Sequence, residues 1–199
     1  MNTGPEPDDQ RLHQEIITCV RCRLSEGRIH AVPGEGPVPA RALLIGEAPG
    51  RREDELGRPF VGRAGTILEG LLSSIGLSRE QVYITSVIKC RPPKNRDPKH
   101  DEIAACQPYL ERQIALLRPS GIVPMGRFPT REIFRMFGLT EEKISDAHGH
   151  VFIIQASYGT VHIIPVYHPA VVTHNPNLWP ELQNDFFQLK TVLDELGYD

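Results

Sequence analysis

The sequence predicts an α/β protein, a three-layer sandwich in which a central, mostly parallel four-stranded sheet is flanked by helices. Short apolar runs alternate along the chain with longer segments of helical periodicity, and glycine or proline closes most of them. The chain has 199 residues, of which 40% are hydrophobic and 24% charged, as in an ordinary globular domain. We expect a disordered N-terminal tail over residues 1–11 and a single domain over residues 12–199.

The first half of the chain predicts two strands, each followed by a helix. Residues 40–48, ARALLIGEA, are an apolar run that ends at a glycine turn, as a buried parallel strand does. The helical pattern of residues 64–77 keeps its large apolar residues on one face. Residues 81–90, QVYITSVIKC, are rich in β-branched residues and predict the next strand. A helix is expected to start at Asp97 and Pro98, an N-cap residue followed by a proline at the first position.

The second half predicts a strand, a hairpin and two helices. Residues 120–126 read as a third strand, and residues 127–139 as a helix closed by Gly138. Residues 150–156 and 161–169 flank the turn SYGT and predict a hairpin whose second arm enters the sheet. A last helix runs from Trp179 to about residue 196, and these apolar side chains recur on its inner face: Leu182, Phe186, Leu189 and Leu193.

Three loops are expected at the carboxyl ends of the strands, where open α/β sheets bind their ligands. They cover residues 46–65, 86–96 and 167–176. The first, GEAPGRREDELGRPFVGRAG, combines five glycines with carboxylates and Phe60. It has neither the terminal lysine and hydroxyl of a phosphate-binding loop nor the GxGxxG of a dinucleotide site. It therefore predicts a pocket in which backbone amides and Glu47 meet a small polar ligand, with Phe60 as an apolar wall.

Charge and composition limit the class of protein. The formal net charge is −3, so a nucleic-acid partner has to be met by a local basic patch, and basic residues do gather in residues 51–63 and 89–99. No segment is long and apolar enough to span a membrane, and the first ten residues are polar, unlike a secretion signal. We expect a cytoplasmic protein, whose cysteines stay reduced.

Four cysteines form a candidate metal site. Cys19 and Cys22 make a CxxC pair, Cys90 follows after 67 intervening residues and Cys106 after 15 more. Four thiolates can close a tetrahedral zinc site or hold a [4Fe–4S] cluster, and the spacing does not choose between them. Cys106 also fits a small apolar residue on a buried helix face. A site filled by four protein ligands leaves no open position, which predicts a structural role.

The motifs GEAPG, PFVGRAG, KCRPPKNRDP and YHPA, together with CxxC and the later Cys106, resemble those of the family 4 uracil-DNA glycosylases. The resemblance covers roughly residues 15–195. It implies a uracil-DNA glycosylase-like fold and a [4Fe–4S] cluster on Cys19, Cys22, Cys90 and Cys106. It also implies an enzyme of base excision repair that hydrolyses the N-glycosidic bond of uracil in DNA and leaves an abasic site.

The same resemblance assigns roles in base binding. The flipped uracil is met by the backbone of the first loop, Gly46, Glu47 and Ala48, and stacks on Phe60. His168 of the HPA motif hydrogen-bonds uracil O2, where negative charge grows as the bond breaks. We expect His168 and Glu47 to be the catalytic residues.

Two positions depart from relatives of the superfamily. Some relatives use an aspartate of the first motif to activate water. This chain has Ala48 at the position of that aspartate, so the aspartate base is missing and Glu47 is the nearest carboxylate. The family usually has an asparagine where this chain has Ser86. A serine hydroxyl cannot both donate to O4 and accept from N3–H of uracil as an amide can, which leaves the base preference open.

DNA contacts are expected from the basic loop and from the segment after His168. The candidate residues for these contacts are Arg91, Lys94, Arg96, His174 and Asn175. His148 and His150 read as hairpin surface rather than as a metal site. We expect a monomer. Two alternatives remain, a glycosylase for hypoxanthine or xanthine because of Ser86, and a non-catalytic iron–sulfur or zinc module that binds nucleic acid.

Overall fold

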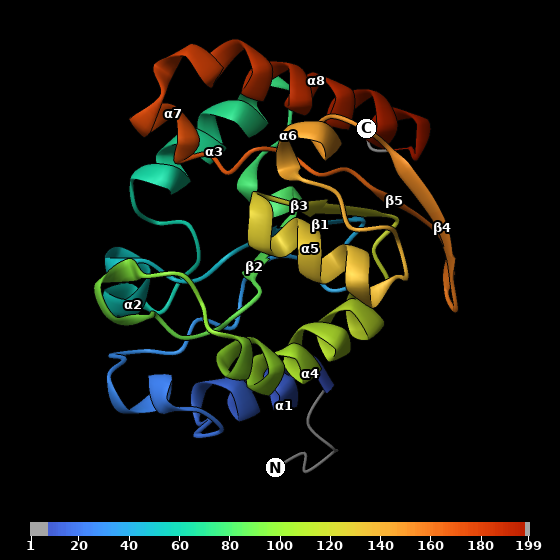
Figure 1. Ribbon diagram of the computed structural model, residues 1–199. Coiled ribbons are helices and arrows are strands. Elements are labelled where there is room, and N and C mark those ends of the chain that lie inside the picture. The colour runs from blue at the N-terminus through green and yellow to red at the C-terminus, as the bar shows by residue number, and fades with distance from the viewer. Residues whose placement is uncertain (1–7, 198–199) are drawn as a thin grey trace.

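A computed structural model describes residues 8–197 and folds them into three layers around one sheet (Figure 1). The sheet has five strands in the order β2-β1-β3-β5-β4. Neighbouring strands are parallel except for β4, which pairs antiparallel with β5 at the edge. The strands are β1 Ala42–Gly46, β2 Tyr83–Ser86, β3 Gly121–Pro124, β4 Phe152–Ala156 and β5 Gly159–Ile163.

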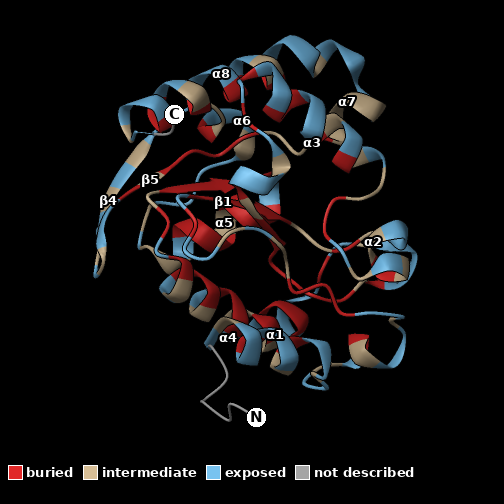
Figure 2. Ribbon diagram, turned by 180° about the vertical axis from the view of Figure 1, so that it is seen from behind, coloured by how far each residue is buried: buried red, intermediate tan, exposed pale blue. Residues whose placement is uncertain are grey.

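Two groups of helices cover the two faces of the sheet. Helices α1 Asp8–Ile17, α4 His100–Leu117 and α5 Arg127–Met136 share one hydrophobic cluster with the sheet. Helices α3 Arg63–Ser74 and α8 Trp179–Glu195 share the other. Alternate residues of β1 enter opposite clusters, Leu43 one and Leu44 the other, because successive side chains of a strand point to opposite faces. Figure 2 shows the buried sheet between helices whose outer sides are exposed.

Short elements fill the loops between these layers. They are the helices α2 Arg51–Leu56, α6 Ile144–Ala147 and α7 Val171–His174, and the 3₁₀ turns Arg23–Glu26, Arg79–Gln81, Pro93–Asn95 and Pro176–Leu178. Among residues 8–197, no helix combines the length and the hydropathy that crossing a membrane requires.

The predicted three-layer α/β fold is confirmed, but the sheet has one strand more than the expected four. The additional strand is the first arm of the hairpin, β4, which pairs with β5 along its whole length. Its alternating burial leaves Ile153 63% exposed, because only one face of this edge strand meets the core.

Several predicted boundaries were wrong. The second arm of the hairpin, expected over residues 161–169, is β5 Gly159–Ile163. The strand expected over residues 81–90 is limited to Tyr83–Ser86. The helix expected from Asp97 starts at His100, because Asp97 pairs with Arg127 (2.8 Å) and the Glu102 carboxylate accepts the Lys99 N–H (2.9 Å) at the helix start. Residues 8–11 of the predicted tail belong to α1, and residues 1–7 lie outside the described residues.

The carboxyl ends of the central strands lie next to one another. Gly46 is in register with Ser86, and Ile45 with Pro124. Beyond β5 the chain continues in parallel to Val166, which forms a bridge with Met125. The three loops that follow these strand ends therefore lie together at the carboxyl end of the sheet, as the sequence predicts.

Candidate active site

A cavity of about 460 Å³ opens at the carboxyl end of the sheet and is lined by all three loops. Its volume is within the range of small-molecule sites in proteins. The predicted residues that line it are Glu47, Ala48, Phe60, Ser86, Arg96, His168 and His174. Gly46 lies directly behind Phe60. The structure therefore brings together all the residues that were predicted to meet the base.

Phe60 forms one wall of the cavity. Its φ is +48°, a left-handed conformation that residues other than glycine adopt rarely and at a cost in energy. Its ring lies so close to Gly46 that a Cβ there would come within 2.7 Å of the Phe60 Cε2 atom. A glycine at the end of β1 is thus needed to seat this ring.

His168 lies against the same cavity, with its ring centroid 5.7 Å from that of Phe60 and the two planes inclined by 30°. The Ala170 N–H donates to His168 Nδ1 over 3.1 Å. In the neutral imidazole the proton therefore resides on Nε2, which makes this atom a hydrogen-bond donor. Burial lowers the pKa of His168 to about 4, against a weaker opposing effect of Glu53, so the ring is neutral at physiological pH.

Glu47 is half-buried at the rim of the first loop. Burial raises the pKa of its carboxyl group, Asp97 raises it further, and Arg127 opposes the shift. The Glu47 carbonyl accepts the Ile88 N–H (3.2 Å), which extends the β1–β2 pairing past the end of β2. A carboxylate with a raised pKa in this position is a better base than an exposed glutamate.

Ser86 ends β2 and is supported from below by a buried lysine. The Lys89 ammonium donates to the Ser86 carbonyl (2.6 Å), to Thr85 Oγ1 (2.7 Å) and to Gln113 Oε1 (2.7 Å). Its side chain is among the largest that are fully buried in the described chain. Three acceptors match the three donors of an ammonium group, so a buried lysine is tolerated here.

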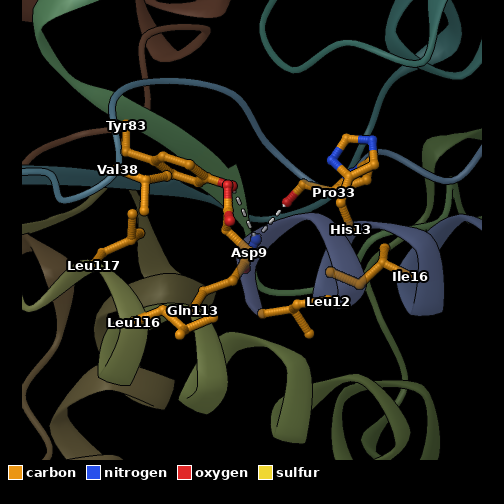
Figure 3. A pocket seen from close by; sticks show the side chains of 10 residues that line it. All are labelled: Asp9, Leu12, His13, Ile16, Pro33, Val38, Tyr83, Gln113, Leu116 and Leu117. Atoms are coloured by element: carbon orange, nitrogen blue, oxygen red, sulfur yellow. Dashed lines mark hydrogen bonds between the residues drawn. The ribbon is translucent and has the colours of Figure 1, made fainter. Parts of the chain in front are cut away.

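Gln113 continues this network away from the cavity. Its Nε2 donates to the Pro33 carbonyl (2.7 Å) and to the Tyr83 hydroxyl (3.4 Å), as Figure 3 shows. The small hollow drawn there lies beside the amino-terminal end of β2 and encloses only about 20 Å³. Because that is room for a single water, this hollow is not a substrate site.

The four cysteines line one cavity between α1, the Cys90 loop and α4, and none forms a disulfide. Three of the sulfurs accept hydrogen bonds from N–H groups: Cys19 from Arg21 (3.4 Å), Cys90 from Arg28 (3.0 Å) and Cys106 from Lys89 (3.3 Å). Cys106 is buried in α4, in agreement with the alternative that it is a small apolar residue on a buried helix face. Within residues 8–197, no group of three or more Cys, His, Asp or Glu side chains is arranged to hold a metal ion.

The predicted DNA-contact residues of the basic loop differ in whether their side chains are already paired within the protein. Arg96 lines the cavity, but its guanidinium forms a two-pronged ion pair with the buried Glu102 (2.6 and 2.8 Å). Arg91 donates to Asn95 (2.7 Å). Lys94 is exposed and has a left-handed φ of +57°.

The segment after His168 contributes one residue to the cavity. His174, the last residue of α7, is exposed and lines the cavity mouth. Asn175 is not among the lining residues, and its side chain accepts the Asn177 N–H (3.3 Å) at the start of the next 3₁₀ turn.

The expectation that His148 is mere hairpin surface is wrong. His148 Nδ1 lies 2.8 Å from an Asp185 carboxylate oxygen, and its ring packs on Tyr167 with centroids 4.1 Å apart. The other Asp185 oxygen accepts the Tyr167 N–H (3.2 Å). Burial raises the pKa of Asp185, and its hydrogen bond with His148 opposes this shift. Asp185, on α8, thus fixes the backbone next to His168. His150 is exposed, as expected.

Two further site residues were missed from the sequence, Glu53 and Arg79. Glu53 lines the cavity from α2, and its Oε1 atom accepts the N–H groups of Val61 (2.9 Å) and Gly62 (2.8 Å). Arg79 donates to the Phe60 carbonyl (2.7 Å). In the sequence both residues stand among surface-like charges, and only the folded loops reveal their contacts with the backbone around Phe60.

The chain is similar in sequence to known uracil-DNA glycosylases. The sequence profile of the Uracil DNA glycosylase superfamily matches residues 33–192. A type-4 uracil-DNA glycosylase of Sulfurisphaera tokodaii is 44% identical over 92% of this chain and 84% of the relative. One of Archaeoglobus fulgidus is 46% identical over 87% of each chain, and a type-5 enzyme of Thermus thermophilus is 34% identical over 69% of this chain and 68% of the relative. The chain belongs to the uracil-DNA glycosylase superfamily, and its relatives place it with the type-4 enzymes.

Proposed function

We propose that this protein is a DNA glycosylase that hydrolyses the N-glycosidic bond of uracil in DNA and leaves an abasic site for base excision repair. One observation carries the proposal: an aromatic ring and a neutral imidazole face the same cavity, 5.7 Å apart. An enzyme cannot reach the glycosidic bond of a stacked base, so the nucleotide has to be extruded into a pocket of this kind.

In the proposed mechanism the extruded uracil stacks on Phe60 and meets the backbone of Gly46, Glu47 and Ala48. The His168 Nε2–H donates to uracil O2 as the bond to the sugar breaks and the base acquires negative charge. A donor aimed at developing charge lowers the barrier more than it stabilises the bound substrate. Because Ala170 holds Nδ1 as an acceptor, the donor is already in place before the reaction.

Glu47 is the proposed partner of the attacking water. Ala48 carries no carboxylate, and burial raises the pKa of the Glu47 carboxyl group, which improves it as a base. In a dissociative reaction the water attacks an already cationic sugar, so a modest base is sufficient and the negative charge of Glu47 also stabilises that cation.

We further propose that Cys19, Cys22, Cys90 and Cys106 hold a [4Fe–4S] cluster. The donor set fits, because all four thiols are free and border one cavity, and N–H groups reach three of their sulfurs. Four cysteine thiolates are the ligand set that would hold a [4Fe–4S] cluster. When bound, the cluster supplies covalent cross-links between the Cys19–Cys22 segment, the basic loop and α4.

DNA binding is proposed to rest on the exposed residues around the cavity mouth, Lys94 and His174 foremost, with Arg91, Arg96 and Asn175 shaping the loops that carry them. The cavity is complete within one chain, which supports a single-domain monomer as the working form. The unpaired cysteines support the reducing cytoplasm as its place of action.

The test is cleavage after alkali of oligonucleotides that carry one uracil, one hypoxanthine or one xanthine. We expect strand breaks with uracil, and a His168→Ala rate lower by about 10²-fold or more under single-turnover conditions. His150→Ala removes an exposed histidine and is the matched control. Activity on hypoxanthine or xanthine instead would favour the second candidate, a glycosylase whose preference is altered by Ser86, which lies buried at the cavity floor. DNA binding without strand breaks would refute both.

A further inference from the structure

We infer that Glu53 and Arg79 are positioning residues that lock Phe60 in its left-handed conformation and thereby set how tightly the base is held. The inference rests on the proposed function and adds to it the origin of the pocket's rigid wall. Neither side chain needs to touch the base, because both act on the backbone that carries the Phe60 ring.

Phe60 requires such a lock. At a φ of +48° the backbone of a residue with a bulky side chain is strained, and relaxation to negative φ would turn the ring away from Gly46. Helix α3 begins directly after this turn and packs against the Phe60 peptide. A Cβ at Gly65 would lie 1.9 Å from the Phe60 carbonyl oxygen, so α3 approaches this peptide as closely as a glycine permits.

The two residues fix the peptide planes on both sides of the Phe60 Cα. Arg79 donates to the carbonyls of Pro59 and Phe60, one from each plane. Glu53 accepts the N–H groups of Val61 and Gly62 (2.9 and 2.8 Å). The φ and ψ angles of Phe60 together set the orientation of one plane relative to the other, so φ cannot relax on its own while both planes are held.

Glu53 and Arg79 together are called the clamp, and its arginine is itself held in place. Arg79 is only 10% exposed, and its Nε donates to Glu35 Oε1 over 2.7 Å. The Glu35 carboxylate is also paired with Arg58 (2.8 and 3.0 Å). The arginine fork is therefore oriented before any base arrives, and pre-oriented groups lose little entropy when a ligand binds.

Glu53 could instead act through its charge, since it lies near enough to His168 to raise the pKa of that imidazole. Amide and alanine variants separate the two roles. Glu53→Gln keeps an oxygen that can accept both N–H groups but removes the charge, whereas Glu53→Ala removes both. Glu69→Ala is the control, because Glu69 also pairs with Arg79 (3.4 Å) but is 54% exposed and makes no contact with the Phe60 backbone.

The experiment measures the single-turnover rate on uracil-containing DNA and the inhibition constant of free uracil, with Phe60→Ala alone and combined with each variant. We expect Glu53→Ala to lower the rate and weaken uracil binding by about tenfold each, and Glu53→Gln to stay within about threefold of the parent. In the Phe60→Ala background, Glu53→Ala should add nothing to either value. Thermal unfolding and visible absorbance of each variant check that it is folded.

Additive losses in the Phe60→Ala background, or equal losses for Glu53→Gln and Glu53→Ala, would overturn the inference and assign Glu53 an electrostatic role. If Glu53→Ala does not fold, Arg79→Lys supplies the same comparison, because lysine keeps a cation but lacks the planar fork whose three nitrogens donate separately to Glu35, Phe60 and Pro59. A parent protein without activity on uracil would refute the proposed function, whereas normal parental activity with unaffected clamp variants refutes only the clamp.

Discussion

Neutral His168 is the centre of the proposed chemistry, and its protonation can be tested through stability. Burial lowers its pKa from the ordinary 6.5 to about 4. As the pH falls, the unfolded chain takes up this proton near the ordinary pKa, while the folded protein takes it up only near the lowered one. The contribution of His168 to stability is therefore present above the pKa that the histidine has in the unfolded chain. It is lost as the pH falls toward the lower pKa that the histidine has in the folded protein. Between about pH 7 and about pH 5 the loss amounts to about 2 kcal/mol.

The perturbation is His168→Asn, which removes the titrating ring and keeps a polar side chain. We expect the free energy of unfolding in urea to fall between these two pH values by about 2 kcal/mol more in the parent than in the variant. Subtracting the two proteins cancels the carboxylates that titrate in both. The histidine NMR signals give a direct check, because the ring of His168 should remain neutral at about pH 5. An equal fall in stability for both proteins, or a His168 signal that titrates at its ordinary pKa, would refute the neutral donor.

Three further predictions concern packing and the thiols. Gly65→Ala should reduce the free energy of unfolding by about 2 kcal/mol or more and lower activity, because the new Cβ would clash with the Phe60 carbonyl. Gly70→Ala in the same helix should stabilise the protein by about 0.5–1 kcal/mol, because a Cβ there meets open space. Thermal unfolding of both variants checks this pair. Lys89→Met should cost about 3 kcal/mol in urea unfolding, since three buried acceptors lose their ammonium; a neutral result would mean that water replaces it. Cys90→Ala should abolish the iron content and the visible absorbance of the purified protein, and unchanged iron would remove Cys90 from the ligand set.

The sequence could predict the layers and the place of the site because each depends on local pattern. Alternating apolar runs and helical faces determine which side of each element is buried, and parallel strands place their carboxyl ends together. That is why the loops that begin near Gly46, Ser86 and Tyr167 could be placed together, although more than a hundred residues separate the first from the last. The roles of Ser86 and His168 within these loops came from the resemblance to the family 4 enzymes. The fifth strand, β4, was predicted as the first arm of the hairpin but was not counted in the sheet, because only the second arm was expected to enter it.

The polar contacts could not be predicted, since they depend on partners that are distant in the sequence. Glu53 stands in a run of charges that resembles solvent-exposed surface, and its role emerges only where α2 meets the loop after Phe60. Lys89 was counted with the basic loop, but three acceptors from β2 and α4 draw it into the core. Asp185 lies on the inner side of the last helix, where its carboxylate has two distant partners.

The contact between Asp185 and the Tyr167 backbone has a consequence for the order in which the molecule matures. The helix that carries Asp185, α8, is synthesised after all five strands of the sheet, yet it fixes the backbone next to His168. A nascent chain that has already formed its first strands therefore still lacks the support for its donor. Newly synthesised protein should gain the ability to excise bases only after α8 has emerged from the ribosome and packed against the sheet.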